Sequence, residues 1–315
     1  MSELLFPTGN NPLPAHSTAG MLTMRDGKRI RYALFRTDAR PLKGTVVVLT
    51  GRNECIEKYF ETVGDLQARG FEVVTLDWRG QGDSDRILRD RGRGYIRNFH
   101  HYVEDLDQLF REIVLPDCRA PFYMLAHSAG ALIALLAAPL MANRIRRMVL
   151  SAPLVALTGY TTTMPAVSRV SNLMVWLGLG RLPLGRSGRP REAAPFDTNI
   201  VTSDPERYRR NQDIYQAHPE LATGSPTAAW VRACTRAAAE IQAQDFVAHM
   251  HIPTLFVAAG ADKVVSTRAT ELYARRLRSG SLLTIDGAKH ELLQERDIFR
   301  DQFMAAFDAF VPGTE

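Results

Sequence analysis

A serine at the centre of a run of small residues is the side chain best placed to act as a nucleophile. The pentapeptide Ala126-His127-Ser128-Ala129-Gly130 follows the apolar run 122–125 and precedes the alanine- and leucine-rich stretch 131–142. A strand, a sharp turn with serine at its tip and then a helix is the context of a nucleophile elbow, and the residues two before and two after the serine must be small. Ala126 stands where glycine is usual. The alternative is a solvent-facing serine that caps a core helix.

An aspartate and a histidine follow the two strand-like runs near the end of the chain. Asp262 comes after the apolar run 254–258, and His290 comes after the run 282–285. The order Ser128, Asp262, His290 is the order in which α/β-hydrolases present nucleophile, acid and base. A histidine within hydrogen-bond reach removes the serine proton, and a carboxylate holds the imidazole in the correct tautomer. Taken singly, each of the two has a structural alternative, because either side chain can cap a nearby helix.

Two backbone N–H groups should stabilise the oxyanion that forms when the serine attacks a carbonyl. One belongs to Ala129, directly after the nucleophile. The other is expected from the loop 50–54, where Gly51 lets the backbone approach the substrate and the N–H of Arg52 is the predicted donor.

The elements that carry these residues alternate between strands and helices, which predicts an α/β fold with a doubly wound, mostly parallel sheet. The hydrolase core is expected to comprise residues 21–152 and 231–315, after an N-terminal arm of residues 1–20. Predicted strands cover residues 21–24, 29–35, 44–49, 71–76, 122–125, 147–150, 254–258 and 282–285, and predicted helices cover 55–69, 100–114, 131–142, 233–245, 268–278 and 298–310.

The alternation stops between residues 153 and 230, where the sequence is irregular. A stretch of this length inside a compact domain predicts an inserted cap or lid. Its apolar run Leu173–Leu179 is expected to pack on the core, with an acyl pocket or a membrane surface as the alternatives. Its arginines are candidates for pairing with a phosphate headgroup, with solvated charge as the equal alternative. They are Arg181, Arg186, Arg189, Arg191, Arg207, Arg209 and Arg210.

Composition and charge exclude several classes of protein. With 45% hydrophobic and 23% charged residues and a net charge of +5, the chain is an ordinary globular protein. No basic run is interleaved with aromatic residues, so no nucleic-acid partner is expected. Three distant cysteines predict neither a metal cluster nor a disulfide framework and fit a reducing compartment. No secretory signal or membrane-spanning run is visible, so the expected location is the cytoplasm, with membrane association left open.

Together with the triad, several short motifs resemble those of the α/β-hydrolase superfamily, and within it the serine aminopeptidase-like group of bacterial lysophospholipases and monoacylglycerol lipases. The resemblance spans roughly residues 22–311. Two departures are Ala126 in place of glycine and Thr50 in place of a histidine. The matching motifs are Gly51-Arg52-x-Glu54 with Lys58-Tyr59, Asp77-x-Arg79-Gly80-x-Gly82-x-Ser84, His127-Ser128-x-Gly130, Thr202 to Tyr208, Pro226-Thr227-x-x-Trp230, Gly260-x-x-Asp262 and Gly287 to Glu291.

The resemblance implies Ser128, Asp262 and His290 as triad, Arg52 and Ala129 as oxyanion donors, and neither a metal nor an organic cofactor. It implies structural roles for Glu54, Asp77, Arg79 and Gly80 in tying the oxyanion loop to the sheet. The predicted function is ester hydrolysis through an acyl-enzyme, with lysophospholipid as the first substrate class. The alternatives are monoacylglycerol or a small ester, then aminopeptidase activity or a non-catalytic binding protein. Substrate-binding residues and oligomeric state are left open.

Overall fold

The structure is a computed structural model that describes residues 3–158, 160–184 and 195–311. In this part of the chain one sheet of eight strands has the order β1-β2-β4-β3-β5-β6-β7-β8. The first two strands pair antiparallel and β2 runs antiparallel to β4, while all later pairs are parallel. The strands are β1 (Ser17–Thr23), β2 (Arg29–Phe35), β3 (Gly44–Leu49), β4 (Phe71–Leu76), β5 (Phe122–His127), β6 (Ile145–Ser151), β7 (Thr254–Ala259) and β8 (Gly280–Ile285).

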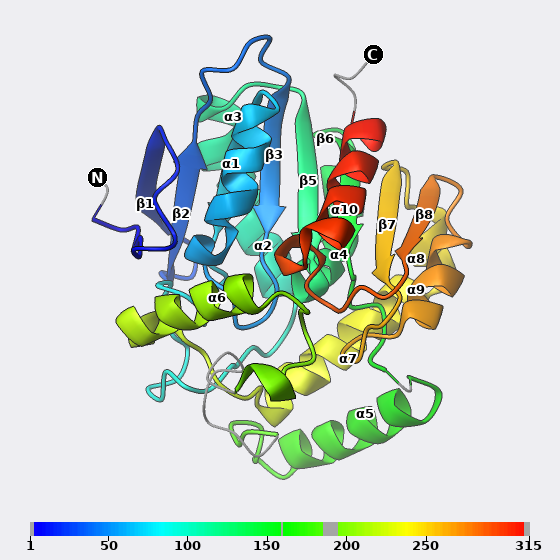
Figure 1. The fold of residues 1–315 in the computed structure, drawn as a ribbon. Coiled ribbons are helices and arrows are strands. Elements are labelled where there is room, and N and C mark those ends of the chain that lie inside the picture. The colour runs from blue at the N-terminus through cyan, green and yellow to red at the C-terminus, as the bar shows by residue number, and fades with distance from the viewer. Residues whose placement is uncertain (1–2, 159, 185–194, 312–315) are drawn as a thin grey trace.

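Helices cover both faces of this sheet, so its central strands are buried on both sides and read as continuous apolar runs. One face packs against α1 and α10, and the other packs against α2, α4, α7 and α9 (Figure 1). The helices are α1 (Phe60–Ala68), α2 (His100–Leu109), α3 (Leu115–Asp117), α4 (Ser128–Met141), α5 (Tyr160–Trp176), α6 (Pro205–Ala217), α7 (Ala228–Gln242), α8 (Gln244–Ala248), α9 (Thr267–Ala274) and α10 (Asp297–Phe310). The predicted fold class is confirmed.

Some predicted boundaries were wrong. The arm was expected to include residues 1–20, but β1 begins at Ser17, which pairs with Phe35 of β2. The helix expected over 233–245 begins at Ala228, because the Thr227 hydroxyl accepts a hydrogen bond from the N–H of Trp230 (3.3 Å). The proposed return to the core at residue 231 therefore falls inside α7.

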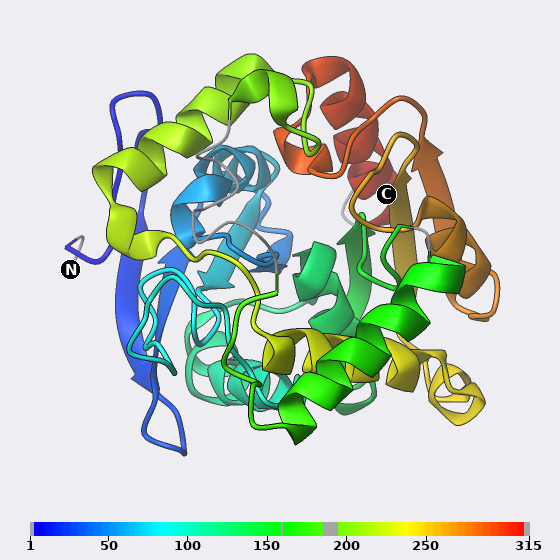
Figure 2. The same ribbon diagram turned by 90° about the horizontal axis from the view of Figure 1, so that it is seen from below.

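The insert holds two long helices that its sequence did not predict. The helix α6 begins after Asp204, whose side chain accepts hydrogen bonds from the N–H groups of Glu206 and Arg207. The other helix, α5, is rich in threonine, valine and serine, which are indifferent helix formers. Figures 1 and 2 show α5 as the outermost helix beyond the carboxyl ends of the strands, with α7 between it and the sheet.

Candidate active site

The turn at Ser128 has the tight geometry of a nucleophile elbow. The strand β5 ends at His127, and Ser128 has φ 52°, a left-handed conformation that is unusual for a residue with a side chain. A Cβ at Gly130 would lie 2.4 Å from the carbonyl oxygen of Thr50 and 2.5 Å from that of Leu49. The glycine is therefore required because the first turn of α4 presses against the end of β3.

Ala126 fits the elbow without strain. It lies in β5, in register with Leu49 of β3 and Leu150 of β6, and it is fully buried in the hydrophobic core. Its φ is outside the left-handed region, unlike that of Ser128. The methyl group in place of the usual glycine is therefore an ordinary core contact.

The structure brings the three predicted triad residues into one chain of hydrogen bonds. The His290 Nε2 atom lies 2.9 Å from the Ser128 Oγ atom, and Nδ1 lies 2.7 Å from the Asp262 Oδ2 atom. The other carboxylate oxygen of Asp262 accepts from the N–H groups of Val264 (2.7 Å) and Val265 (3.0 Å). Because Asp262 is an acceptor, Nδ1 carries the proton and Nε2 is left to accept the serine proton.

The loop that carries the predicted oxyanion donor Arg52 is fixed by groups from the loop after β4. The side chain of Gln81 accepts from the Asn53 N–H (3.2 Å) and donates to the Gly51 carbonyl (2.9 Å). The indole of Trp78 donates to the Thr50 carbonyl (2.8 Å). Asn53 takes φ 64°, so the backbone reverses directly after Arg52.

The resemblance implied structural roles for Glu54, Asp77 and Arg79, and these three residues stabilise different parts of the structure. Glu54 accepts a hydrogen bond from the Gly51 N–H, and Asp77 accepts one from the Ile56 N–H (3.0 Å). Arg79 instead pairs with Asp105 and with Asp26 in the β1–β2 turn, so it holds the edge of the sheet.

A buried charge network lies directly beneath the oxyanion loop. The Lys58 ammonium is 2.9 Å from a carboxylate oxygen of Glu54 and 2.8 Å from one of Glu291. Tyr59 donates a further hydrogen bond to Glu54 (2.7 Å). Burial raises the pKa of Glu54, but Lys58, His127 and the Tyr59 hydroxyl outweigh it and hold that pKa at about 2. The carboxylate is therefore ionised and fixed.

The second histidine of the elbow has a different environment from His290. His127 is buried, its Nδ1 atom lies 3.2 Å from the Ser151 carbonyl oxygen, and its ring centre is 4.9 Å from that of His290. Burial lowers the pKa of His127 to about 4. A neutral imidazole with this contact supports the turn, whereas His290 alone bridges Ser128 and Asp262.

A cavity of about 330 Å³ opens over Ser128 and His290. Both predicted oxyanion residues, Arg52 and Ala129, line it. Its apolar wall comes mainly from the insert and α7, namely from Leu154, Leu157, Leu184, Pro226 and Trp230, with Val264 beside Asp262. The arrangement suits a substrate with a carbonyl near Ser128 and an apolar group against the insert.

Segments of the insert also brace both sides of the cavity. The hydroxyl of Tyr215 on α6 donates to the Asn53 carbonyl (2.9 Å), next to Arg52. On the other side, the Glu291 N–H donates to the Val201 carbonyl (2.8 Å), directly after His290. Gln81 and Tyr215 were not predicted as site residues, although Gln81 lies within the Asp77–Ser84 motif.

Most of the arginines proposed for a headgroup lie elsewhere. Arg207 and Arg210 both pair with Glu61 on α1, at 2.6 and 2.7 Å. These ion pairs connect α6 to the core. Arg209 and Arg181 line other cavities. Three further candidates, Arg186, Arg189 and Arg191, lie outside the described residues.

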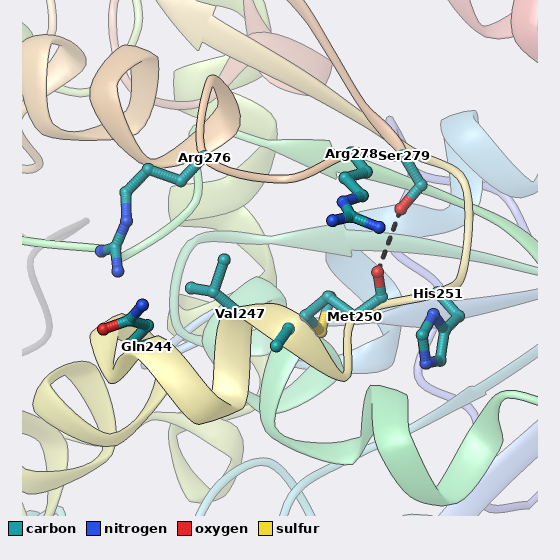
Figure 3. Close-up of a pocket in the computed structure, with 8 residues that line it drawn as sticks. Gln244, Val247, Met250, His251, Arg276, Arg278 and Ser279 are labelled. Carbon is teal, nitrogen blue, oxygen red and sulfur yellow. Dashed lines mark hydrogen bonds between the residues drawn. The ribbon is translucent and has the colours of Figure 1, made fainter.

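A larger cavity, of about 740 Å³, lies at the amino ends of β7 and β8, away from the triad. Its lining includes Arg276, Arg278 and His251, and the Ser279 hydroxyl there donates to the Met250 carbonyl (3.2 Å) (Figure 3). No catalytic set is formed by the residues that line it. Across the described part of the chain, no group of three or more His, Cys, Asp and Glu residues is placed to hold a metal.

Comparison with known proteins finds relatives of this chain among lipid hydrolases. A family model described as serine aminopeptidase, S33, matches residues 40–297. Lysophospholipase L2 of Escherichia coli (strain K12) is 31% identical over 300 residues, which covers 89% of this chain and 83% of that protein. Monoglyceride lipase of Homo sapiens is 24% identical over 278 residues, with coverages of 87% and 84%.

Solved structures share the same fold. A soluble variant of monoglyceride lipase from Saccharomyces cerevisiae, in complex with a substrate analog, superposes with a TM-score of 0.76 at 18% identity. The match covers 97% of this chain and 98% of that one.

Proposed function

Since the chain belongs to the serine aminopeptidase S33 family of α/β-hydrolases and is an ester hydrolase, we propose that it cleaves carboxylic esters of lipids through an acyl-enzyme on Ser128. The observation that carries this proposal is the hydrogen-bonded chain from Ser128 through His290 to Asp262, at 2.9 and 2.7 Å. Its position at the base of an apolar cavity supports a lipid ester as substrate.

In the proposed mechanism, the Ser128 Oγ atom attacks the ester carbonyl while His290 takes its proton at Nε2. The N–H groups of Arg52 and Ala129 stabilise the oxyanion. Collapse of the tetrahedral intermediate breaks the bond to the alcohol, which leaves with the proton from His290. Water then attacks the acyl-enzyme by the same route, and the carboxylic acid is released. Asp262 stabilises the imidazolium at each step.

The test is hydrolysis of a lysophospholipid by the purified protein and by its Ser128→Ala variant. The variant should lose activity by about 10⁶, the scale seen when a triad nucleophile is removed. If the variant, freed of contaminating esterase, keeps most of the activity, Ser128 is not the nucleophile.

Lysophospholipid is the first substrate class that we propose, and Arg52 supports it. The guanidinium of Arg52 donates to the Gly224 carbonyl (2.8 Å) and lies 5.6 Å from the ring centre of Trp230, within the wall of the Ser128 cavity. The two carboxylates that line the cavity, Glu54 and Glu291, are both paired with Lys58. A phosphate in the cavity therefore meets a cation near the reacting carbonyl.

Arg52→Gln keeps the backbone donor and removes the charge. It should lower kcat/KM for a lysophosphatidyl substrate about tenfold or more relative to a monoacylglycerol of the same chain length. Arg209→Gln, on the exposed face of α6, is the matched control and should leave this ratio unchanged. Equal losses on both substrates in Arg52→Gln would favour monoacylglycerol or a simple ester.

We further propose that residues 153–230 act as the cap that selects the substrate, and that the protein meets this substrate at a membrane surface. Aminopeptidase activity is disfavoured because a free amine needs an available carboxylate, and Glu54 and Glu291 are held by Lys58. A non-catalytic binding protein is disfavoured by the complete triad.

A further inference from the structure

The oxyanion loop and the loop that carries His290 follow strands that are not neighbours. In the sheet, β5, β6 and β7 lie between β3, which precedes the oxyanion loop, and β8, which precedes His290. Strand pairing therefore does not set the distance between the oxyanion donors and the base directly. This distance matters because a misplacement of about 1 Å can cost a factor of about 10² in rate. A direct contact between the two loops fixes their spacing.

Lys58 makes such a contact from the short helix η1 (Ile56–Tyr59). Its ammonium lies 2.9 Å from the Glu54 Oε1 atom and 2.8 Å from the Glu291 Oε1 atom. Glu54 belongs to the oxyanion loop, and Glu291 directly follows His290. The ammonium therefore joins the two loops through one carboxylate from each.

On the oxyanion side, this link continues to the backbone. The second carboxylate oxygen of Glu54 accepts hydrogen bonds from the Gly51 N–H and from the Tyr59 hydroxyl (2.7 Å). A Cβ at Gly51 would lie 2.8 Å from that oxygen, so glycine leaves room for the carboxylate. The ion pair is thus connected to the residue directly before the predicted donor Arg52.

On the side of the base, two further hydrogen bonds hold the segment after His290. The side-chain amide of Gln294 donates to the Lys58 carbonyl (3.0 Å), and its backbone N–H donates to the Glu291 carbonyl (2.7 Å). Lys58 therefore contacts this segment through its backbone as well as its ammonium. A shift of the segment relative to η1 would break both contacts.

Burial makes these ion pairs an expensive way to stabilise a fold. Lys58 is 1% exposed, and Glu54 and Glu291 are 4% and 8% exposed, so two carboxylates share one ammonium away from water. Desolvation of a buried ion pair often exceeds its attraction, and apolar side chains of similar volume are commonly at least as stable. A short ion pair differs from apolar packing in that it fixes the distance between its partners.

We propose that Lys58 and Glu291 are positioning residues, which hold His290 in register with the oxyanion loop. Lys58 acts through Glu54, and Glu291 acts through the backbone that it shares with His290. The inference rests on the proposed function, because the effect of the bridge is on the rate of ester hydrolysis.

The first variant is Glu291→Gln, which keeps the shape of the side chain and leaves Lys58 paired with Glu54. With a soluble ester, kcat should fall about 10- to 100-fold while KM stays near that of the parent, because the spacing acts in the transition state. Affinity for an alkylboronic acid should fall in step with kcat, since its tetrahedral adduct on Ser128 mimics that state. A parent-like kcat, or a rise in KM alone, would overturn the proposal.

The matched control is Asp105→Asn. Asp105 is buried and shares Arg79 with Asp26 at the edge of the sheet, so this substitution also replaces one of two carboxylates on a buried cation. It should lower the thermal midpoint yet leave kcat and the boronic acid affinity unchanged. An equal fall of kcat in the control and in Glu291→Gln would reveal a general effect of stability, and the positioning role would be lost.

Glu291→Asp is a second variant, which keeps the charge and shortens the side chain by one methylene. Its kcat should lie between those of the parent and Glu291→Gln. A double-mutant cycle then tests the link between the loops. Adding Glu291→Gln to Glu54→Gln should cost less than Glu291→Gln alone, because the bridge is already weakened. Additive losses of kcat would mean that the two carboxylates act independently.

The proposed function and the positioning role fail in different ways. If the parent cleaves no ester and binds no boronic acid, the proposed function fails. If the parent cleaves the ester and Glu291→Gln and Glu291→Asp do so at the same kcat, only the positioning role fails.

Discussion

At the scale of the residue, the two adjacent positions His127 and Ser128 have opposite tasks. Ser128 is held in a left-handed conformation that aims its hydroxyl at His290, and His127 is buried behind it. A buried imidazole must be neutral to avoid the cost of desolvating a charge. The pKa of His127 is about 4, against an ordinary value near 6.5, so protonation of His127 destabilises the folded state.

The stability of the protein should therefore fall as the pH is lowered from about 6.5 to about 4. His127 binds its proton in the unfolded chain first, so its contribution is fully present above pH 6.5 and is lost as pH falls through the folded pKa. The contribution is on the order of 3 kcal/mol. The measurement is the urea midpoint as a function of pH, for the parent and for His127→Gln.

The substitution His127→Gln should flatten this part of the profile, and His251→Gln at an exposed histidine should leave it unchanged. The low pKa of Glu54 adds a second loss at lower pH, since that carboxylate stabilises the fold above pH 4.5 and less as pH falls toward 2. If the pH profile of the urea midpoint were identical for His127→Gln and the parent, burial would not be holding His127 in its neutral form.

At the scale of the element, the active site depends on loops that are held by their neighbours. Backbone groups of the loop after β3 form hydrogen bonds with the side chains of Gln81 and Trp78, which lie in the loop after β4. The parallel register of β3 and β4 places these two loops at the same edge of the sheet. An oxyanion donor contributes only if it is in place before the reaction.

Replacing Gln81 with methionine keeps the size of the side chain and leaves the Asn53 N–H and the Gly51 carbonyl without their partner. We expect kcat to fall about 10- to 100-fold with little change in KM, because the loss is felt in the transition state. The free energy of unfolding should also fall by about 1–3 kcal/mol. Steady-state kinetics on a soluble ester provide the measurement, with Gln67→Met on α1 as the control. A rise in KM with unchanged kcat would argue that Gln81 does not position the oxyanion donor.

The ends of the strands were predictable from sequence, but the insert was not. Runs such as 44–49 and 254–258 are so apolar that only strands covered on both faces account for them, and the turn residues beyond them carry the triad. The helix α5 was missed because apolar side chains occur on both of its faces. Leu173 and Trp176 are exposed, whereas Val167 and Val175 are half-buried, so the sequence shows no one-sided helical spacing. The expectation that Leu173–Leu179 packs on the core was wrong for Leu173, Trp176, Leu177 and Leu179, whose side chains are exposed.

The ion pairs of Arg207 and Arg210 were not predictable from sequence for a related reason. Sequence shows that Arg207 is charged but not that Glu61, some 146 residues away, is its partner. Arg52, by contrast, was identified for its backbone N–H, and its side chain acquired a proposed role only once the cavity was visible. Charge pairs distant in sequence are set by the fold and leave no local pattern.

At the scale of the whole molecule, ion pairs fasten the insert to the core. Arg207 of α6 contacts Glu61 of α1 and Asp297 at the start of α10, at 2.6 and 2.8 Å. It also donates to the Glu295 carbonyl, five residues beyond His290 (2.8 Å). One guanidinium therefore joins α6 to α1 and α10, the two helices that cover one face of the sheet.

Arg207→Gln should lower the thermal midpoint by about 2–6 °C, since it leaves a partly buried carboxylate with weaker partners. It should leave the ratio of kcat/KM for lysophospholipid and monoacylglycerol unchanged. Calorimetry and kinetics on the same preparation give both values, with Arg209→Gln as the control. A changed ratio of the kcat/KM values with an unchanged thermal midpoint would instead indicate that Arg207 binds the headgroup.

The arrangement of the sheet, the elbow and the cap indicates that Ser128 is an activated nucleophile. The most direct measurement is reaction of the intact protein with a fluorophosphonate, followed by peptide mass mapping of the adduct. We predict one adduct, on Ser128, that forms quickly in the parent and is lost in His290→Ala. Labelling at another residue, or no labelling of a folded parent, would contradict it.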